Sequence, residues 1–215
     1  LNRLKSEVIN IVTVEDPVEY QLPGISQVQV NERAGITFAS GLRSILRQDP
    51  NVVMVGEIRD AETAKIAFQA ANTGHLVLTT LHTNDASSAV TRLVDLGVDP
   101  YVIASSLLCV LAQRLVRKNC PHCQVTDQVD KEVAVRLELL DKKGLERRIK
   151  KGQGCEACQF TGYLGRVGIY EMLMVDDELR KLIVKGASDT EIAENARERR
   201  IKDMFGDCRD KLIQG

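Results

Sequence analysis

Acidic residues and histidines that could handle a phosphate group or a metal ion stand at the ends of apolar runs. Glu57 follows residues 52–55, a short apolar run typical of a strand buried on both faces of a parallel sheet. His82 follows a second such run, residues 76–81. Because ligands of open α/β sheets bind beyond the carboxyl ends of the strands, we expect Glu57 and His82 to face one site. A carboxylate there can hold Mg²⁺ or a water, although a solvated loop acid would look the same in sequence.

A further acidic cluster follows the first β-rich run, residues 8–14. Its carboxylates lie past the end of that run, where Pro17 stops the strand because proline cannot donate to a ladder. The cluster consists of Glu15, Asp16 and Glu19. Arg59, two residues after Glu57, is the basic residue best placed to meet a phosphate group.

Two histidines stand on either side of residues 76–81, with His75 before the run and His82 after it. We expect both to converge with the carboxylates beyond the sheet, and a structural imidazole is the alternative for each. They lack the i, i+4 spacing of a helical zinc pair, which disfavours a zinc hydrolase.

Four cysteines form two CxxC pairs, which place two sulfurs on one turn at bonding distance from a metal. The pairs are Cys120 with Cys123 and Cys155 with Cys158. The 31 residues between them exceed the roughly 15–20 of compact zinc motifs, so we expect a helical excursion over the charged residues 131–149. Four thiolates close a tetrahedral zinc site and leave no open position, so the site would be structural. His122 could replace one cysteine, and unligated thiols are the alternative.

The elements that position these residues alternate between strand and helix, which predicts an α/β fold with a parallel sheet. Thr37 and Asp60 are placed to cap helices. Residues 101–115 are apolar on most of their surface and predict a buried helix. The predicted strands are residues 8–14, 27–30, 52–55, 76–81 and 167–174, and the predicted helices include 37–46, 61–71, 83–96, 101–115 and segments after residue 176.

Composition excludes several classes of protein. A chain of 215 residues can bury one core plus an appendage. The formal net charge of −1 and the scarcity of aromatic residues argue against nucleic acid as a partner. No apolar run approaches the roughly 20 residues of a membrane span, and paired CxxC motifs are typical of a reducing, cytoplasmic environment.

Three motifs in order carry a resemblance to a known family. They are VEDPVEY (residues 14–20), LRQDPNVVMVGEIRD (46–60) and TGHLVLTTLHTNDA (73–86). This order and spacing resemble the aspartate box, Walker B element and histidine box of the ATPases of type II secretion and type IV pilus assembly. The resemblance covers nearly the whole chain. It implies the second half of a RecA-like P-loop NTPase core over 1–116, a tetracysteine zinc element over 117–160, and a return strand with a C-terminal helical region over 161–215.

The resemblance also implies roles for the residues named above, with ATP, Mg²⁺ and Zn²⁺ as ligands. Glu19 matches the catalytic glutamate, and Glu57 the Walker B acid that holds Mg²⁺ through water. His82 is the histidine expected to sense the γ-phosphate. The residues implied for nucleotide and magnesium binding are Glu15, Asp16, Glu57, Arg59, His75 and His82. The residues implied for catalysis are Glu19, Glu57 and His82. The implied zinc ligands are the four cysteines.

The chain departs from the family in lacking the Walker A loop, GxxxxGK[ST]. The resemblance places that loop upstream of Leu1, and residues 1–4 look like the end of its helix. We therefore expect this piece alone to be inactive. The complete protein is expected to be a homo-hexameric ATPase at the cytoplasmic face of the inner membrane. It would move pilin or pseudopilin through the membrane platform and other cytoplasmic components of the machine.

A binding module is the competing hypothesis. The four cysteines and the basic run at residues 147–151 would suit a zinc-ribbon-like protein that docks nucleic acid or a protein partner. Balanced charge and the lack of interleaved aromatic residues weigh against it.

Overall fold

The computed structural model describes residues 1–139 and 148–214. The chain divides into two compact units, one formed by Leu1–Cys109 with Met174–Ala193 and the other by Val110–Leu173 with Glu194–Gly215. The division that the sequence suggests, at residues 117 and 161, stays a prediction.

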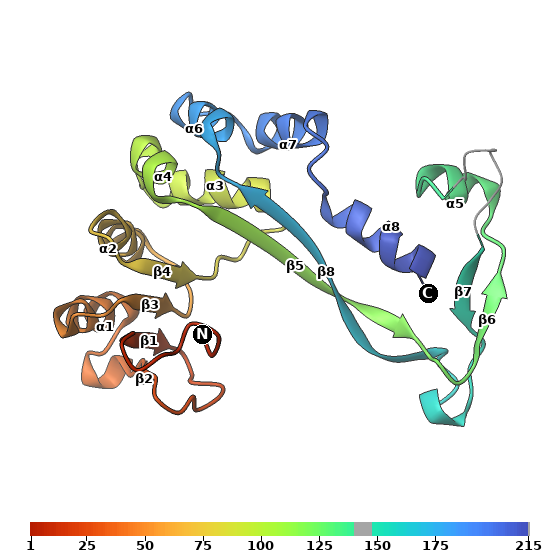
Figure 1. The fold of residues 1–215 in the computed structure, drawn as a ribbon, viewed down its shortest axis with the longest axis horizontal. Helices are drawn as coiled ribbons and strands as arrows, with labels where there is room; N and C mark the ends of the chain where they lie inside the picture. The colour runs from red at the N-terminus through yellow and green to blue at the C-terminus, as the bar shows by residue number, and fades with distance from the viewer. Residues whose placement is uncertain (140–147, 215) are drawn as a thin grey trace. The chain divides into compact units, whose positions relative to one another are not determined.

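A four-stranded parallel sheet forms the centre of the first unit (Figure 1). Its strands are β1 (Ile11–Glu15), β2 (Ser26–Gln29), β3 (Val52–Val55) and β4 (Leu76–Thr79), in the order β2-β1-β3-β4. The inner strands β1 and β3 carry fully buried residues such as Val14, Val53 and Val55. The predicted parallel α/β sheet is therefore confirmed, and β2, which overlaps the predicted strand 27–30, lies at its edge.

The helices of the first unit are α1 (Phe38–Ile45), α2 (Ala61–Asn72), α3 (Ala86–Asp95), α4 (Pro100–Ser106), α6 (Asp177–Val184) and the start of α7 (Asp189–Glu198), with 3-10 turns η1 (Glu32–Ala34) and η2 (Leu46–Gln48). Two of them, α1 and α2, begin after the caps that the sequence predicts, Thr37 and Asp60. The side chains of Thr37, Asp60 and Asp85 each accept a hydrogen bond from a backbone N–H in the first turn. Such caps satisfy donors that a helix cannot pair internally.

Two local predictions are wrong. Residues 101–115 do not form one buried helix, because α4 ends at Ser106 and strand β5 (Cys109–Asn119) follows. β5 pairs with a distant strand, and Leu111 and Leu115 are more than half exposed. A short apolar run cannot be assigned to helix or strand from periodicity alone. Residues 2–4 form a turn instead of the end of a helix.

The second unit is built from two pairs of strands. β5 pairs with β8 (Tyr163–Met174) as a two-stranded ribbon, and β6 (Gln124–Asp127) pairs antiparallel with β7 (Ile149–Gly152). The remaining elements are α5 (Lys131–Arg136), the 3-10 turn η3 (Glu156–Cys158) and α8 (Met204–Gln214). Ile213 of α8 packs on a small apolar cluster of Val129, Ala134 and Leu139. The predicted helical excursion is confirmed for 131–136, and residues 140–147 lie outside the described residues.

Among the residues described, no helix is both long enough and apolar enough to cross a membrane.

Candidate active site and metal centre

Glu57 and three other side chains form a group beyond the carboxyl ends of β1 and β3. A guanidinium nitrogen of Arg59 lies 2.6 Å from Glu57 Oε1, and His82 Nε2 lies 3.1 Å from Glu57 Oε2. Asp16 Oδ2 is 4.0 Å from the other terminal nitrogen of Arg59. The side chain of Glu57 is only 13% exposed, whereas that of His82 is 86% exposed. The predicted convergence is therefore observed for Asp16, Glu57 and His82, and Arg59 lies between two of these side chains.

Backbone contacts hold this arrangement in place. Gly56 donates its N–H to the carbonyl of Val14, and a Cβ on Gly56 would lie 3.2 Å from that oxygen. Glycine therefore lets the chain leave β3 close beside β1. Thr80 accepts the N–H of Ile58 with its carbonyl and donates its hydroxyl to the carbonyl of Gly56. Thr80 is not among the predicted site residues, because in sequence it lies within the predicted strand 76–81.

Glu57 is ionised at neutral pH. The hydrogen bond from Arg59 lowers the pKa of Glu57, burial opposes this, and His82 adds a smaller lowering. A carboxylate that stays charged at the carboxyl edge of the sheet can bind a hard cation, or it can hold the side chains of groups that bind phosphate.

Replacing Arg59 should raise the pKa of Glu57. Arg59→Gln removes the largest lowering influence, so the midpoint of a carboxyl ¹³C NMR titration of Glu57 should move up toward the ordinary value. In the unchanged chain a lowered folded-state pKa contributes stability above the unfolded-state pKa, and this is lost as pH falls through the lower value. His82→Gln is the matched control and should shift the midpoint less. An unchanged midpoint in Arg59→Gln would contradict the assignment.

The other predicted site residues are placed differently. Glu15 accepts hydrogen bonds from Thr13 Oγ1 and Gln27 Nε2 at 2.5 and 2.9 Å. Glu19 is exposed and forms no hydrogen bond or ion pair with the residues that the structure describes.

His75 precedes β4, so it lies at the amino ends of the parallel strands, opposite Glu57 and His82. Its Nδ1 lies 2.9 Å from the carbonyl of Ala70 and 3.1 Å from Thr73 Oγ1. The expected convergence is therefore wrong for His75 within this chain, because the length of β4 separates it from His82. The role of His75 in nucleotide binding stays a prediction.

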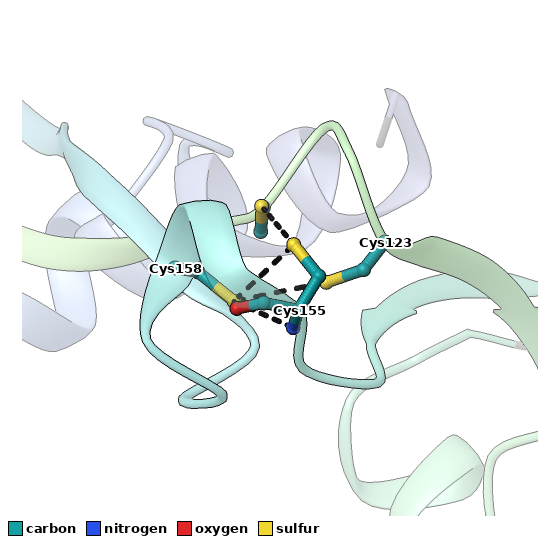
Figure 2. A group of neighbouring side chains, drawn as sticks. Cys123, Cys155 and Cys158 are labelled. Carbon is teal, nitrogen blue, oxygen red and sulfur yellow. Dashed lines mark hydrogen bonds between the residues drawn. The ribbon is translucent and has the colours of Figure 1, made fainter.

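Four thiols gather in the second unit at distances that suit one metal ion. Cys120 and Cys155 sulfurs are 3.9 Å apart, as are those of Cys123 and Cys158, and all four lie within 4.8 Å of one another. Figure 2 shows Cys123, Cys155 and Cys158 turned toward each other. A tetrahedral site with Zn–S bonds of about 2.3 Å requires sulfurs about 3.8 Å apart. His122 is exposed and is not part of this group.

The thiols differ in their surroundings. Burial raises the pKa of Cys158, but backbone N–H groups of Cys155 and Gly162 outweigh this and lower it to about 6. Burial raises the pKa of Cys123 to about 11, against one N–H from Gly154. The set therefore includes one sulfur that is readily a thiolate, the form that binds metal.

Comparison with known proteins gives consistent matches along the whole chain. The family model described as type II/IV secretion system protein matches residues 1–215. The chain is 54% identical over its full length to the type IV pilus assembly ATPase PilB of Thermus thermophilus, covering 24% of that protein. It is also 54% identical to the type II secretion system ATPase E of Vibrio cholerae, covering 42% of it. It thus spans less than half of these relatives.

Among solved structures, the pilus retraction motor PilT with bound ADP matches with a TM-score of 0.67 and 28% identity, over 96% of this chain and 49% of that one. The Legionella pneumophila ATPase DotB matches with a TM-score of 0.61 and 27% identity, over 96% and 48% of the two chains. These neighbours support the RecA-like α/β fold expected from the sequence.

Proposed function

Because the chain belongs to the type II/IV secretion system protein family, we propose that it is part of an ATP-hydrolysing motor of secretion or pilus assembly. The observation that carries this proposal is the group formed by Glu57, Arg59, Asp16 and His82 at the carboxyl edge of the parallel sheet. Phosphoryl transfer needs a carboxylate that holds the metal ion and a second group that orients the attacking water. It also needs cationic groups that stabilise the negative charge of the transition state. The names of the relatives, among them pilus assembly and type II secretion ATPases, agree with it.

In the proposed reaction Glu19 orients a water and accepts its proton as the water oxygen bonds to the γ-phosphorus. The bond from that phosphorus to the β–γ bridging oxygen breaks, which leaves ADP and phosphate. Arg59 is 58% exposed and can turn from Glu57 toward the phosphate oxygens. His82, whose Nε2 lies 3.1 Å from Glu57 Oε2, is the residue proposed to contact the γ-phosphate.

Glu57 is the proposed residue for Mg²⁺, with Asp16 and Glu15 as supporting acids. Its ionised, partly buried carboxylate fits a hard cation, whose role when bound is to neutralise phosphate charge. His75 is also proposed to contribute to nucleotide binding.

The four cysteines are the proposed ligands of one structural Zn²⁺. Their sulfur separations support tetrahedral coordination, and two N–H contacts to Cys158 favour the thiolate form of that sulfur.

The complete protein is proposed to act as a homo-hexamer at the cytoplasmic face of the inner membrane. There ATP hydrolysis would drive pilin or pseudopilin through the membrane platform and other cytoplasmic components. The domain limits at residues 116 and 160 belong to the same proposal. The nucleic-acid or protein-docking module is less favoured because the family match extends over all 215 residues and not over the four-cysteine element alone.

Nucleotide binding tests the proposal. The 215-residue chain lacks GxxxxGK[ST], whose backbone N–H groups and lysine supply most phosphate contacts, so we expect weak ATP binding and negligible hydrolysis. A longer natural chain that carries this loop should bind Mg²⁺-ATP at least about tenfold more tightly, the equivalent of about 1.4 kcal/mol, and hydrolyse it. Isothermal titration of both chains measures this. Equal nucleotide affinities would contradict the proposal.

A further inference from the structure

We propose that Gly162 is the positioning residue of the four-cysteine centre, where it joins the two CxxC turns and couples metal binding to the start of β8. The inference rests on the proposed zinc site. It concerns a residue outside both CxxC motifs, and three sets of contacts carry it.

Gly162 makes backbone hydrogen bonds to both CxxC turns. Its N–H donates to Cys158 Sγ at 3.3 Å, and its carbonyl accepts the N–H of Cys120 at 2.9 Å. Gly162 thus contacts a sulfur of the Cys155/Cys158 pair and the backbone of the Cys120/Cys123 pair. Groups that hydrogen-bond metal ligands orient them and tune the metal, so a small movement here displaces two ligands together.

The end of β7, at Gly152, crosses Gly162 so closely that neither glycine has room for a side chain. A Cβ on Gly162 would lie 2.5 Å from the carbonyl oxygen of Gly152, and a Cβ on Gly152 would overlap the carbonyl of Gly162. Two residues further on, Gly154 donates its N–H to Cys123 Sγ at 3.3 Å. The crossing of Gly152 and Gly162 therefore also fixes the distance between the segments that supply N–H groups to Cys123 and Cys158.

The same crossing closes the end of the β5/β8 ribbon. Cys120 directly follows β5, and Gly162 directly precedes β8. Beside this point, the guanidinium of Arg117 on β5 lies 4.1 Å from the ring centroid of Tyr163 on β8. Metal bound by Cys120 and Cys158 would thus hold together the ends of two strands that are far apart in sequence.

Alanine substitutions at two glycines with the same backbone angle test the proposal. Gly162 and Gly165 both have a φ of +76°, but an added Cβ at Gly165 meets nothing within 4 Å. Both substitutions place a side chain at the same positive φ, and only Gly162→Ala disturbs the crossing. Gly162→Ala should weaken Zn²⁺ binding by about 10–100-fold in competition with a chelator. It should also alter the visible absorption spectrum of bound Co²⁺, which reports tetrahedral thiolate coordination.

Gly165→Ala should keep the metal affinity and the Co²⁺ spectrum of the unchanged chain. Gly152→Ala, which disturbs the crossing from the other side, should reproduce the effect of Gly162→Ala. Thermal melts of the metal-free proteins separate positioning from general damage. We expect the residues around the centre to lose their order without metal, so the added Cβ of Gly162→Ala then meets no fixed neighbour, and Gly162→Ala and Gly165→Ala should melt alike. Overturning results are equal metal affinity in Gly162→Ala and Gly165→Ala, or a metal-free melt lowered in Gly162→Ala alone. If the unchanged chain binds no Zn²⁺ or Co²⁺, the proposed zinc site fails as well.

Discussion

Glu19→Gln, made in the longer chain that carries the phosphate-binding loop, is expected to lower ATP turnover by roughly 10²–10⁴-fold, or about 3–5 kcal/mol of barrier. Glutamine keeps the size of the side chain and one acceptor, but it cannot take a proton from the attacking water. Glu19 is the acid of its cluster that makes no hydrogen bond or ion pair within the described part of the chain, so it is available to a water. Nucleotide affinity should change little. Single-turnover kinetics and equilibrium nucleotide binding measure the two effects separately.

Two other acids proposed for the site serve as controls for Glu19. Glu57→Gln should instead change the Mg²⁺ dependence of turnover, because its carboxylate is assigned to the metal side. Glu15→Gln should be milder than Glu19→Gln, since Glu15 is already engaged by Thr13 and Gln27. An inactive Glu15→Gln together with a nearly normal Glu19→Gln would show that the two roles are reversed.

Removing one thiol from the four-cysteine centre should have the second large effect. Structural zinc contributes apparent binding free energies of roughly 10–16 kcal/mol at neutral pH in small zinc-finger peptides. Cys158 is buried and receives two backbone N–H groups, so Cys158→Ser should abolish tight metal binding. Amide hydrogen exchange should then lose protection in the described residues of 117–160. The parallel sheet should stay protected, because its inner strands have an apolar core of their own.

Chelation of the unchanged chain should reproduce the exchange pattern of Cys158→Ser. Cys208→Ser is the matched control, since Cys208 lies on α8 outside the cluster, and it should retain one metal per chain. Elemental analysis that finds no metal in protein purified without chelator would refute the zinc assignment.

Local sequence determined most of the scaffold. Thr37 and Asp60 predicted where two helices begin, because a capping side chain acts within the first turn and needs no distant partner. The apolar run 52–55 predicted an inner strand of a parallel sheet, since both of its faces are covered. That sheet in turn brought Glu57 and His82 together, as residues that follow neighbouring parallel strands must lie at one edge.

Contacts between distant residues decided what the sequence left open or misassigned. Residues 109–119 became a strand because β8, more than forty residues later, supplies the pairing that local propensity cannot reveal. His75 was separated from His82 because the two ends of a parallel strand face opposite edges of the sheet. The two CxxC pairs predicted a four-sulfur centre, but their spacing did not say how the intervening residues would bring the sulfurs together. That was settled in three dimensions, where the backbones of Gly152 and Gly162 meet at a distance that only glycine allows.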